Sequence, residues 1–338
     1  MVETARPGSL VSVLIVTFNS SASLAQCFAS LQQQDHSPLE LVVVDNNSSD
    51  STRTLLAQAP LSGTVILNET NRGFAAAQNQ AMREASGEWR LCLNPDVMLA
   101  PDFISKLLAA DAPASVGALC GKLLRWVPGA EPERSGIIDS TGIYFQPNLR
   151  HLDRGAEQPD AGQFQRQEYV FGATGAAALY RRRMVEEVCV EGQFFDEEFF
   201  SYREDADLAW RAQLMGWRCL YVPAAVGWHQ RRVTPERRES LPHEINWHSV
   251  KNRFLMRAKN AGAGLCLHTF IPALVRDVVI FGYALLRDWR MFSALWYPLA
   301  HWGGLRGKRK WIQARRRVPD KQLARWFRWQ PASEPLEP

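Results

Sequence analysis

The stretch RLCLNPDVMLAPDF, residues 90–103, begins as an apolar strand and changes character within three residues. Its LCL segment is typical of a buried strand, after which Asn94-Pro95 breaks the pattern and a single carboxylate, Asp96, follows. An acid at this position either caps the helix that begins near residue 100 or faces a ligand. The neighbouring strands decide between these two interpretations.

Three apolar, β-branched runs precede this strand, and a predicted helix separates each from the next. The four strands are LVSVLIVTF (residues 10–18), LELVVVD (39–45), TVILN (64–68) and EWRLCLN (88–94). The first helix ends near residue 34, the second covers residues 52–59, and the third follows NRGF (71–74). Apolar strands that alternate with helices are typical of a mostly parallel sheet with helices on both faces. The sequence therefore predicts an α/β fold.

Polar residues follow each of these strands at its carboxyl end. They are Thr17-Phe18-Asn19, Asp45-Asn46, Asn71-Arg72-Gly73 and Asn94-Pro95-Asp96. Because ligands of such sheets bind outside the carboxyl ends of the strands, we expect these groups to share one rim. Asp96 is therefore predicted to face a ligand cleft.

A second group of acids lies in FFDEEFFSYREDADLAW, residues 194–210. The dipole of a helix favours acids at its start, and we expect a helix over 205–215 and a strand over 218–222. The aromatic residues between the acids indicate a partly buried wall, where the pKa of a carboxylate rises toward the range of a general base. Asp96 and His229, in the loop after that strand, suit Mg²⁺ or Mn²⁺ with phosphate oxygens as further ligands.

Bulk properties allow one large domain or two modest ones in the 338 residues. The six cysteines are scattered without metal or redox spacing, which predicts reduced, buried thiols in a cytosolic protein.

The apolar run near the N-terminus is interpreted as a strand and not as a signal peptide. Residues 116–180 are expected to form short strands and loops, and the small residues of EYVFGATGAAALYRR (168–182) let a ligand approach the backbone.

The composition changes from residue 265 onward. The apolar segment FIPALVRDVVIFGYALLRDWRMFSALWYPLAHW (270–302) is interrupted by charged residues, so it is a poor spanning helix, and RGKRKWIQARRR follows it. Residues 268–338 carry 13 Lys and Arg against 5 Asp and Glu, a net charge of +8. This pattern favours helices that lie on an anionic membrane surface, with packing on the core or a homodimer as the alternative. No nucleic-acid module is visible, so nucleic acid is not expected as a partner.

Five motifs in order, VSVLIVTFN, LVVVDNNSSD, NRGFAAAQN, LNPDV and EDADLAWRAQLMGWR, resemble family-2 glycosyltransferases of the GT-A fold. The closer resemblance is to the rhamnosyltransferase-like branch, which builds bacterial surface polysaccharides. It covers about residues 10–229. It implies a GT-A catalytic domain over residues 8–264, and the composition predicts a basic, aromatic helical region over 265–330.

The resemblance also implies roles for individual residues. Asp96 matches the last acid of the family's Asp-x-Asp metal motif, whose first acid is replaced by Asn94, and His229 matches a metal-bound histidine of some members. Asp205 is the implied catalytic base, with Glu204 beside it. The implied nucleotide-binding residues are Thr17, Asn19, Asp45, Asn71, Arg72, Gly73, Asn79 and Asn94.

The implied reaction is inverting, Mg²⁺- or Mn²⁺-dependent transfer of a sugar to a polyprenyl-linked or glycan acceptor. L-Rhamnose on thymidine diphosphate is the favoured donor, and a uridine diphosphate sugar is the alternative. The enzyme is expected to be cytoplasmic and peripheral on the inner face of the cell membrane. It is expected to act in pathways such as O-antigen synthesis. A sugar-nucleotide pyrophosphorylase would need a glycine-rich, lysine-containing loop, which TFNSSASL (17–24) lacks. A scaffold that binds sugar nucleotides without catalysis is the remaining alternative.

Overall fold

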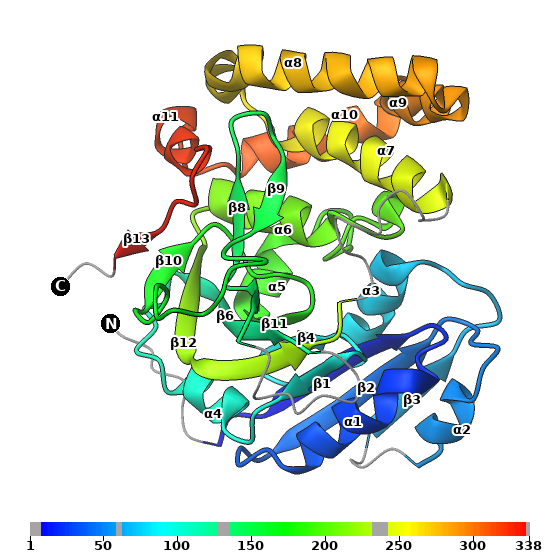
Figure 1. The fold of residues 1–338 in the computed structure, drawn as a ribbon, viewed down its shortest axis with the longest axis vertical. Helices are drawn as coiled ribbons and strands as arrows, with labels where there is room; N and C mark the ends of the chain where they lie inside the picture. Colours follow the sequence, from blue (N-terminus) through cyan, green and yellow to red (C-terminus); the bar gives the residue numbers. More distant parts are fainter. Residues whose placement is uncertain (1–7, 59–62, 127–135, 232–242, 336–338) are drawn as a thin grey trace.

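The computed structural model describes residues 8–58, 63–126, 136–231 and 243–335 (Figure 1). Its N-terminal half confirms the predicted alternation of strands and helices. The strands are β1 (Val11–Thr17), β2 (Leu39–Asp45), β3 (Gly63–Leu67) and β4 (Trp89–Leu93), and the helices are α1 (Ser21–Gln32), α2 (Thr52–Leu56) and α3 (Phe74–Glu84). The four strands are parallel in the order β4-β1-β2-β3, so their carboxyl ends share one rim.

The second half of the catalytic fold extends this sheet with strands of mixed direction. They are β5 (Val97–Leu99), β6 (Val116–Arg125), β7 (Ile138–Ser140), β10 (Glu168–Val170), β11 (Ala177–Arg181), β12 (Arg218–His229) and β13 (Glu334–Pro335), and β8 (Ile143–Phe145) with β9 (His151–Asp153) forms a separate hairpin. Strand β11 runs antiparallel between β4 and β6, and β12 is parallel to β6. The helices are α4 (Phe103–Leu108), α5 (Arg182–Val188) and α6 (Glu204–Leu214), with a 3₁₀ turn, η2 (Glu197–Phe199).

Two details differ from the sequence-based expectations. Strand β6 is ten residues long, so the middle of the chain is more regular than predicted. His229 was expected in a loop but is the last residue of β12, which continues past Pro223. Proline cannot donate to a ladder and suggests a strand end, yet the register shift between Val222 and Val226 carries the strand past it and pairing then resumes.

The hydrophobic core has two clusters, and the largest fully buried side chains include Trp89 and Trp210. The six cysteines are free thiols, and four of them are buried, as predicted, whereas Cys189 is partly buried and Cys266 is exposed.

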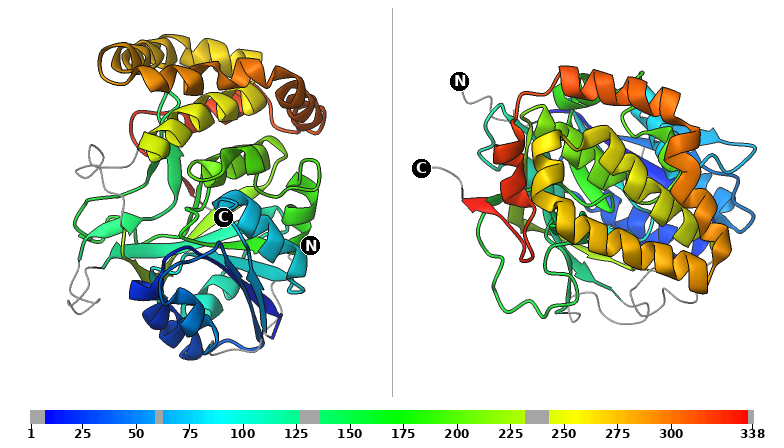
Figure 2. Two further views of the ribbon diagram at one scale, coloured as in Figure 1. Left: turned by 90° about the vertical axis from the view of Figure 1, so that its right-hand side faces the viewer. Right: turned by 90° about the horizontal axis from the view of Figure 1, so that it is seen from above.

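The C-terminal region is helical, as predicted, and forms a layer at one end of the molecule (Figures 1 and 2). It comprises α7 (His243–Asn260), α8 (Ala263–Leu286), α9 (Phe292–Ala300), α10 (Trp302–Ala314) and α11 (Asp320–Leu323). Helix α7 packs on both α9 and α10, and the guanidinium of Arg309 in α10 donates to the carbonyls of Ala258 and Ala261 at the end of α7. Because these contacts cross residue 265, the predicted domain boundary there stays a prediction.

Buried ion pairs attach this helical layer to the acidic segment around η2. The Nζ atom of Lys259 contacts the carboxylates of Asp196 and Asp207, the latter at 3.0 Å. Lys308 Nζ lies 2.7 Å from Asp196 and 2.7 Å from Glu198. Buried charges need such partners, so the helical layer and the acid-bearing segment depend on each other for stability.

Candidate active site

The structure brings Asp96 and His229 together at the rim of the sheet. Strand β5, directly after Asp96, pairs antiparallel with the end of β12, so that His229 lies opposite Val97. The backbone N–H of Gln230 also donates to the carbonyl of Asp96 at 2.9 Å. These contacts place His229 Nε2 3.5 Å from Asp96 Oδ1.

A third residue, Asp139, orients the His229 ring. Asp139 Oδ2 lies 2.8 Å from His229 Nδ1, and both side chains are buried. Arg231 Nε lies 3.0 Å from Asp139 Oδ1, and its guanidinium also contacts Asp153. Sequence reasoning missed Asp139, although one acid inside the apolar run GIIDST (136–141) was the available signal.

These neighbours control the charge of His229. Burial alone would lower its pKa, but the carboxylates of Asp139 and Asp96 outweigh burial and raise the pKa to about 10. A metal ion that binds Nε2 must therefore displace a proton. The Asp139 contact would then hold the ring as the Nδ1–H tautomer, which leaves Nε2 to face Asp96.

The Asp96 and His229 pair fits a divalent ion. Asp96 Oδ1 is buried and accepts no hydrogen bond from any described residue. Two ligand atoms at right angles, each about 2.1 Å from a Mg²⁺ ion, lie about 3.0 Å apart, close to the 3.5 Å found here. Within the described ranges no group of three His, Cys, Asp or Glu side chains could hold a metal, so phosphate oxygens or water would complete the coordination.

Glu204 and Asp205 begin α6 on the other side of the rim. Glu204 is buried, its Oε2 has no hydrogen-bond partner among the described residues, and burial followed by the charge of Asp205 raises its pKa to about 8. Burial also raises the pKa of Asp205 against the opposing hydrogen bond from Gly175 N–H, and the charge of Asp153 raises it further. These two shifts agree with the expectation that carboxylates among the aromatic residues of the segment 194–210 have raised pKa values.

The segment before α6 holds a strained conformation that presents the two acids. Phe200, Tyr202 and Arg203 have positive φ angles of 62°, 71° and 71°. Non-glycine residues adopt such angles at a cost of roughly 1–3 kcal/mol each and only where the surroundings enforce them. Here the amide of Asn252 in α7 donates to the carbonyls of Phe199, Ser201 and Tyr202 at 2.7–2.9 Å.

The two halves of the site meet at the residues that precede β11. Gly175 N–H donates to Asp205 Oδ2 at 3.0 Å. The next residue, Ala176, accepts a 2.9 Å hydrogen bond from the N–H of Asn94 through its carbonyl. Because one peptide segment contacts both Asp205 and the Asn94-Pro95-Asp96 turn, both acids lie at the same rim. Gly175 belongs to the small-residue stretch that the sequence indicated.

Two predicted nucleotide-binding residues, Thr17 and Asp45, are fully buried at the ends of β1 and β2. Thr17 Oγ1 donates to Asp45 at 2.9 Å, Ser48 donates through its N–H and its hydroxyl, and Arg53 Nε lies at 2.8 Å. These donors overcome the effect of burial and lower the pKa of Asp45. Both carboxylate oxygens are thus occupied, so the predicted contact with a base requires the partly exposed Arg53 to move away.

The loop before α3 lies against the strained segment. Asn71 Oδ1 accepts from Gly73 N–H at 2.9 Å, and Asn71 and Arg72 are exposed. Gly73 has φ 83°, and a Cβ atom there would lie 2.5 Å from the Phe200 ring, so only glycine fits. Ala75 N–H also donates to the carbonyl of Phe200 at 3.1 Å. The predicted contacts of Asn71, Arg72 and Gly73 with the nucleotide stay predictions.

Asn79 has a structural role in this fold, and its predicted contact with the nucleotide stays a prediction. The Asn79 side chain is buried and exchanges hydrogen bonds with the backbone of Phe195 at 2.7 and 2.9 Å, with a further one to Glu197. It therefore anchors the acidic segment, because it lies on the face of α3 toward η2. Asn19, with φ 50°, accepts from Ser49 N–H at 2.8 Å and so ties the ends of β1 and β2 together.

Comparison with known proteins agrees with this geometry. Residues 12–189, more than half of the chain, match the family model of glycosyl transferase family 2, and the chain belongs to this family of enzymes. It is 28% identical over 243 residues, 66% of this chain and 76% of the relative, to the N-acetylglucosaminyl-diphospho-decaprenol L-rhamnosyltransferase of Mycobacterium tuberculosis.

Other relatives and solved structures agree on family and fold. The chain is 28% identical to an N-acetylglucosaminyltransferase of Azorhizobium caulinodans over 67% of this chain and 55% of that protein. The fold is similar to S. aureus TarS 1-349 in complex with UDP-GlcNAc, with a TM-score of 0.54, 17% identity and 90% of each chain covered. It is also similar to the Pyrobaculum calidifontis mannosyltransferase PcManGT with GDP-Man and Mn²⁺, with a TM-score of 0.52, 19% identity and coverage of 91% and 85%. These structures confirm the GT-A fold.

Proposed function

We propose that this chain is an inverting, divalent-metal-dependent glycosyltransferase that moves L-rhamnose from dTDP-L-rhamnose to a lipid-linked acceptor during synthesis of a bacterial cell-surface polysaccharide. One observation carries the proposal. The Asp96 and His229 pair and the Asp205 carboxylate lie at one rim, joined through the peptide segment of Gly175. A metal-ligand pair beside a partly buried carboxylate suits transfer with inversion, which needs a base for the acceptor and stabilisation of the leaving group.

In this reaction Asp205 takes the proton of the acceptor hydroxyl while the oxygen attacks the anomeric carbon and the bond to the nucleotide diphosphate breaks. Burial raises the pKa of Asp205, which makes the carboxylate a stronger base. Glu204, with its pKa raised to about 8, carries a proton near neutral pH and avoids a second negative charge beside the base. Asp96 and His229 would hold the divalent ion, which would supply positive charge to stabilise the departing diphosphate.

The donor assignment rests on the mycobacterial relative, which is named as an L-rhamnosyltransferase. A uridine diphosphate sugar is the second candidate, since other relatives are named N-acetylglucosaminyltransferases. Thymine and uracil differ by one methyl group, worth about 1 kcal/mol, so the base alone separates the two donors weakly. The sugar pocket must supply most of the discrimination.

The acceptor assignment follows the same relative, whose name specifies an N-acetylglucosaminyl-diphospho-decaprenol. A polyprenyl diphosphate that carries a sugar stays in the membrane, so the enzyme would work as a peripheral protein on the inner face of the cell membrane. A soluble glycan acceptor would not need this location. The acceptor therefore links the catalytic rim to a lipid surface.

The test uses the purified full-length chain with Mn²⁺ and a panel of nucleotide sugars. We expect dTDP-L-rhamnose to raise the melting temperature most and to yield free dTDP when a polyprenyl-diphosphate-linked N-acetylglucosamine is added. Asp205→Asn should lower transfer at least a hundredfold and leave the donor-induced thermal shift intact.

The matched control is Asp102→Asn, which removes an acid of an exposed pair with Lys106 and should transfer at the wild-type rate. Transfer by Asp205→Asn at that rate would refute the base assignment. Donor binding by the wild type without any release of nucleotide diphosphate would instead identify a scaffold.

A further inference from the structure

Helix α8 carries an apolar outer face that the rest of the chain leaves exposed. Its inner stripe, Leu265, Thr269, Ala273 and Ala284, is buried against the protein. The residues on the other sides are large and apolar, among them Ile271, Leu274, Val275, Val278, Phe281 and Leu285, and all of them are exposed. The face runs from residue 267 to 286, about 30 Å of helix. A large exposed apolar surface of this kind marks a site of contact with a partner or a membrane.

Two charged residues interrupt the sequence of α8, of which Arg276 is partly exposed and Asp277 lies away from this face. Asp277 turns inward, where its carboxylate binds Arg253 at 2.9 Å and also contacts Arg257, both in α7. Contrary to the expectation from its interrupted sequence, α8 is long enough and apolar enough to cross a membrane, and 17% of its most apolar stretch is buried in the protein. Crossing would pull Asp277 away from two arginines, so the ion pairs favour a helix that stays on the protein.

The surroundings of α8 match the headgroup region of an anionic membrane. Trp289, Trp296, Trp302 and Trp329 are exposed around the same helical layer. Tryptophan prefers the boundary between hydrocarbon and headgroups because its ring is apolar and its N–H is polar. Residues 268–338 also carry 13 basic against 5 acidic residues. A net positive charge attracts anionic lipid. A homodimer interface is less favoured, because the core of such an interface is depleted in lysine.

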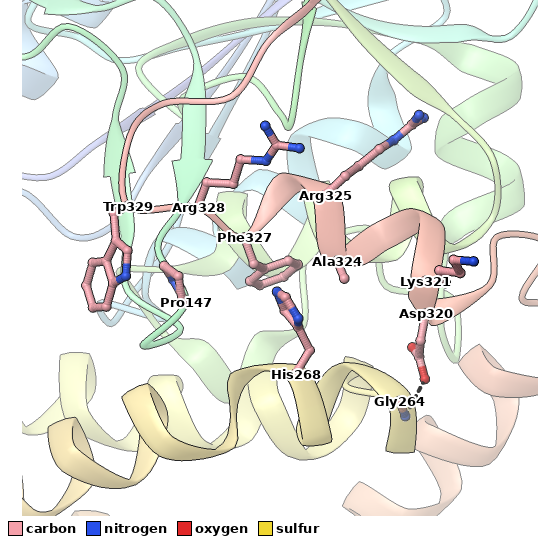
Figure 3. A pocket seen from close by; sticks show the side chains of 10 residues that line it. All are labelled: Pro147, Gly264, His268, Asp320, Lys321, Ala324, Arg325, Phe327, Arg328 and Trp329. Atoms are coloured by element: carbon pink, nitrogen blue, oxygen red, sulfur yellow. Dashed lines mark hydrogen bonds between the residues drawn. The ribbon is translucent and has the colours of Figure 1, made fainter.

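A hollow opens beside the N-terminal end of α8, with a volume of about 710 Å³ and a mostly apolar lining (Figure 3). His268 of α8 and Phe327 point toward each other in it, and Trp329 forms another part of the wall. Lys321 and Arg328 are exposed lining residues, and Asp320 also lines the hollow but is paired with Arg316 at 2.6 Å. Aromatic walls with cations nearby suit a phospholipid, whose chains are apolar and whose phosphate is anionic.

We propose that the outer face of α8 docks parallel to the surface of an anionic phospholipid bilayer, and that the hollow beside it receives a lipid of that bilayer. The inference rests on the proposed function only in that a lipid-linked acceptor gives the docking a purpose. Helix α8 enters the headgroup region with its apolar side and stays attached to α7 through Asp277. The layer formed by α8, α9 and α10 then holds the catalytic fold at the membrane (Figure 2).

The experiment measures co-sedimentation of the full-length protein with vesicles of phosphatidylcholine and of phosphatidylcholine with phosphatidylglycerol. We expect the wild type to sediment with the anionic vesicles and the double variant Ile271→Glu, Val278→Glu to bind them at least tenfold more weakly. The matched control is Val65→Glu with Leu67→Glu, which changes two exposed apolar residues on β3 at the other end of the molecule and should bind like the wild type (Figure 1). Equal binding of the α8 variant and the wild type would overturn the proposal.

Three further measurements separate the outcomes. Binding that does not depend on phosphatidylglycerol would overturn the assignment to anionic lipid, and retention in the membrane after alkaline extraction would overturn docking in favour of spanning. A wild-type dimer in sedimentation velocity that the α8 variant dissociates would assign the face to a second copy of the chain. The donor-induced thermal shift needs no vesicles, so failure of the proposed function is seen apart from failure of the docking.

Discussion

Replacing Asp139 with asparagine tests whether the imidazole of His229 belongs to a metal site. The substitution keeps the size of the side chain and leaves Asp96 and His229 unchanged. In the wild type, Asp139 Oδ2 lies 2.8 Å from His229 Nδ1, and the side chains are 1% and 9% exposed. An asparagine oxygen could still accept from Nδ1, but its NH₂ group would then face Arg231 Nε, a donor that now lies 3.0 Å from Asp139 Oδ1. The ring loses its anionic anchor in either orientation.

The expected size of the effect follows from this geometry. A hydrogen bond to a charged group is worth about 1.5–3 kcal/mol, which corresponds to roughly a 10- to 150-fold change in an equilibrium constant. Loss of a residue that orients a metal-bound histidine typically lowers metal affinity about 10- to 100-fold. We therefore expect Asp139→Asn to weaken the pH-independent affinity for Mn²⁺, obtained by titration at several pH values, by one to two orders of magnitude. At neutral pH part of this loss is offset, because the variant has a lower His229 pKa and the metal ion displaces a proton more easily.

The assay is calorimetric titration of Mn²⁺ into the protein with the nucleotide diphosphate present, so that no turnover is needed. Asp160→Asn is the matched control, because Asp160 also pairs with a buried cation, Lys122, at 2.7 Å. It should lose some stability and keep the wild-type affinity for Mn²⁺. If folded Asp139→Asn binds Mn²⁺ as tightly as the control does, the assignment of His229 to the metal is wrong.

Two further substitutions test the electrostatics of the acidic segment. Glu204→Gln should become more stable relative to the wild type as pH rises from 5 to 8.5, by up to about 4 kcal/mol of unfolding free energy in denaturant. The reason is that a glutamate whose pKa is raised from 4.5 to about 8 stabilises the fold fully below pH 4.5 and loses that contribution as pH rises through 8. A stability difference that does not change with pH would contradict the buried, protonated state. Lys259→Met should cost about 3–5 kcal/mol of unfolding free energy, because it removes the shared partner of Asp196 and Asp207. Its control is Lys106→Met, in an exposed pair, which should change stability by less than about 1 kcal/mol.

Local sequence patterns were sufficient to predict the N-terminal half of the fold. The runs that became β1, β2 and β4 are apolar at most of their buried positions, with Ser12, Thr17, Asp45 and Arg90 as the exceptions, so strand identity and direction follow from the sequence alone. The rim follows too, since parallel strands place their carboxyl ends together. Asp96 and Asp205 could be chosen as candidates because each ends or begins an element at a polar break in an apolar pattern.

The remainder depends on contacts between distant segments. Asp139 is one acid in an apolar run, and only the pairing of β5 with β12 brings His229 toward Asp96 and leaves its other nitrogen facing Asp139. Asn79 was chosen by its resemblance to a ligand contact, and its hydrogen bonds to the backbone of Phe195 could not be foreseen because they depend on how residues 195–197 fold against α3. The charges of α8 look like interruptions in sequence, whereas the helix turns Asp277 toward α7.

The balance of charge at the rim gives a physical reason for a divalent ion. Asp96, His229, Asp139, Arg231 and Asp153 form a continuous chain of ion pairs with alternating sign. With the pKa of His229 raised to about 10, the chain holds three negative and two positive groups. Binding of an ion to Nε2 removes one of those positive charges, which leaves three carboxylates and one guanidinium, a net charge of −2. Because buried charge must be compensated, a dication matches what remains, and a monovalent cation would leave one carboxylate unpaired.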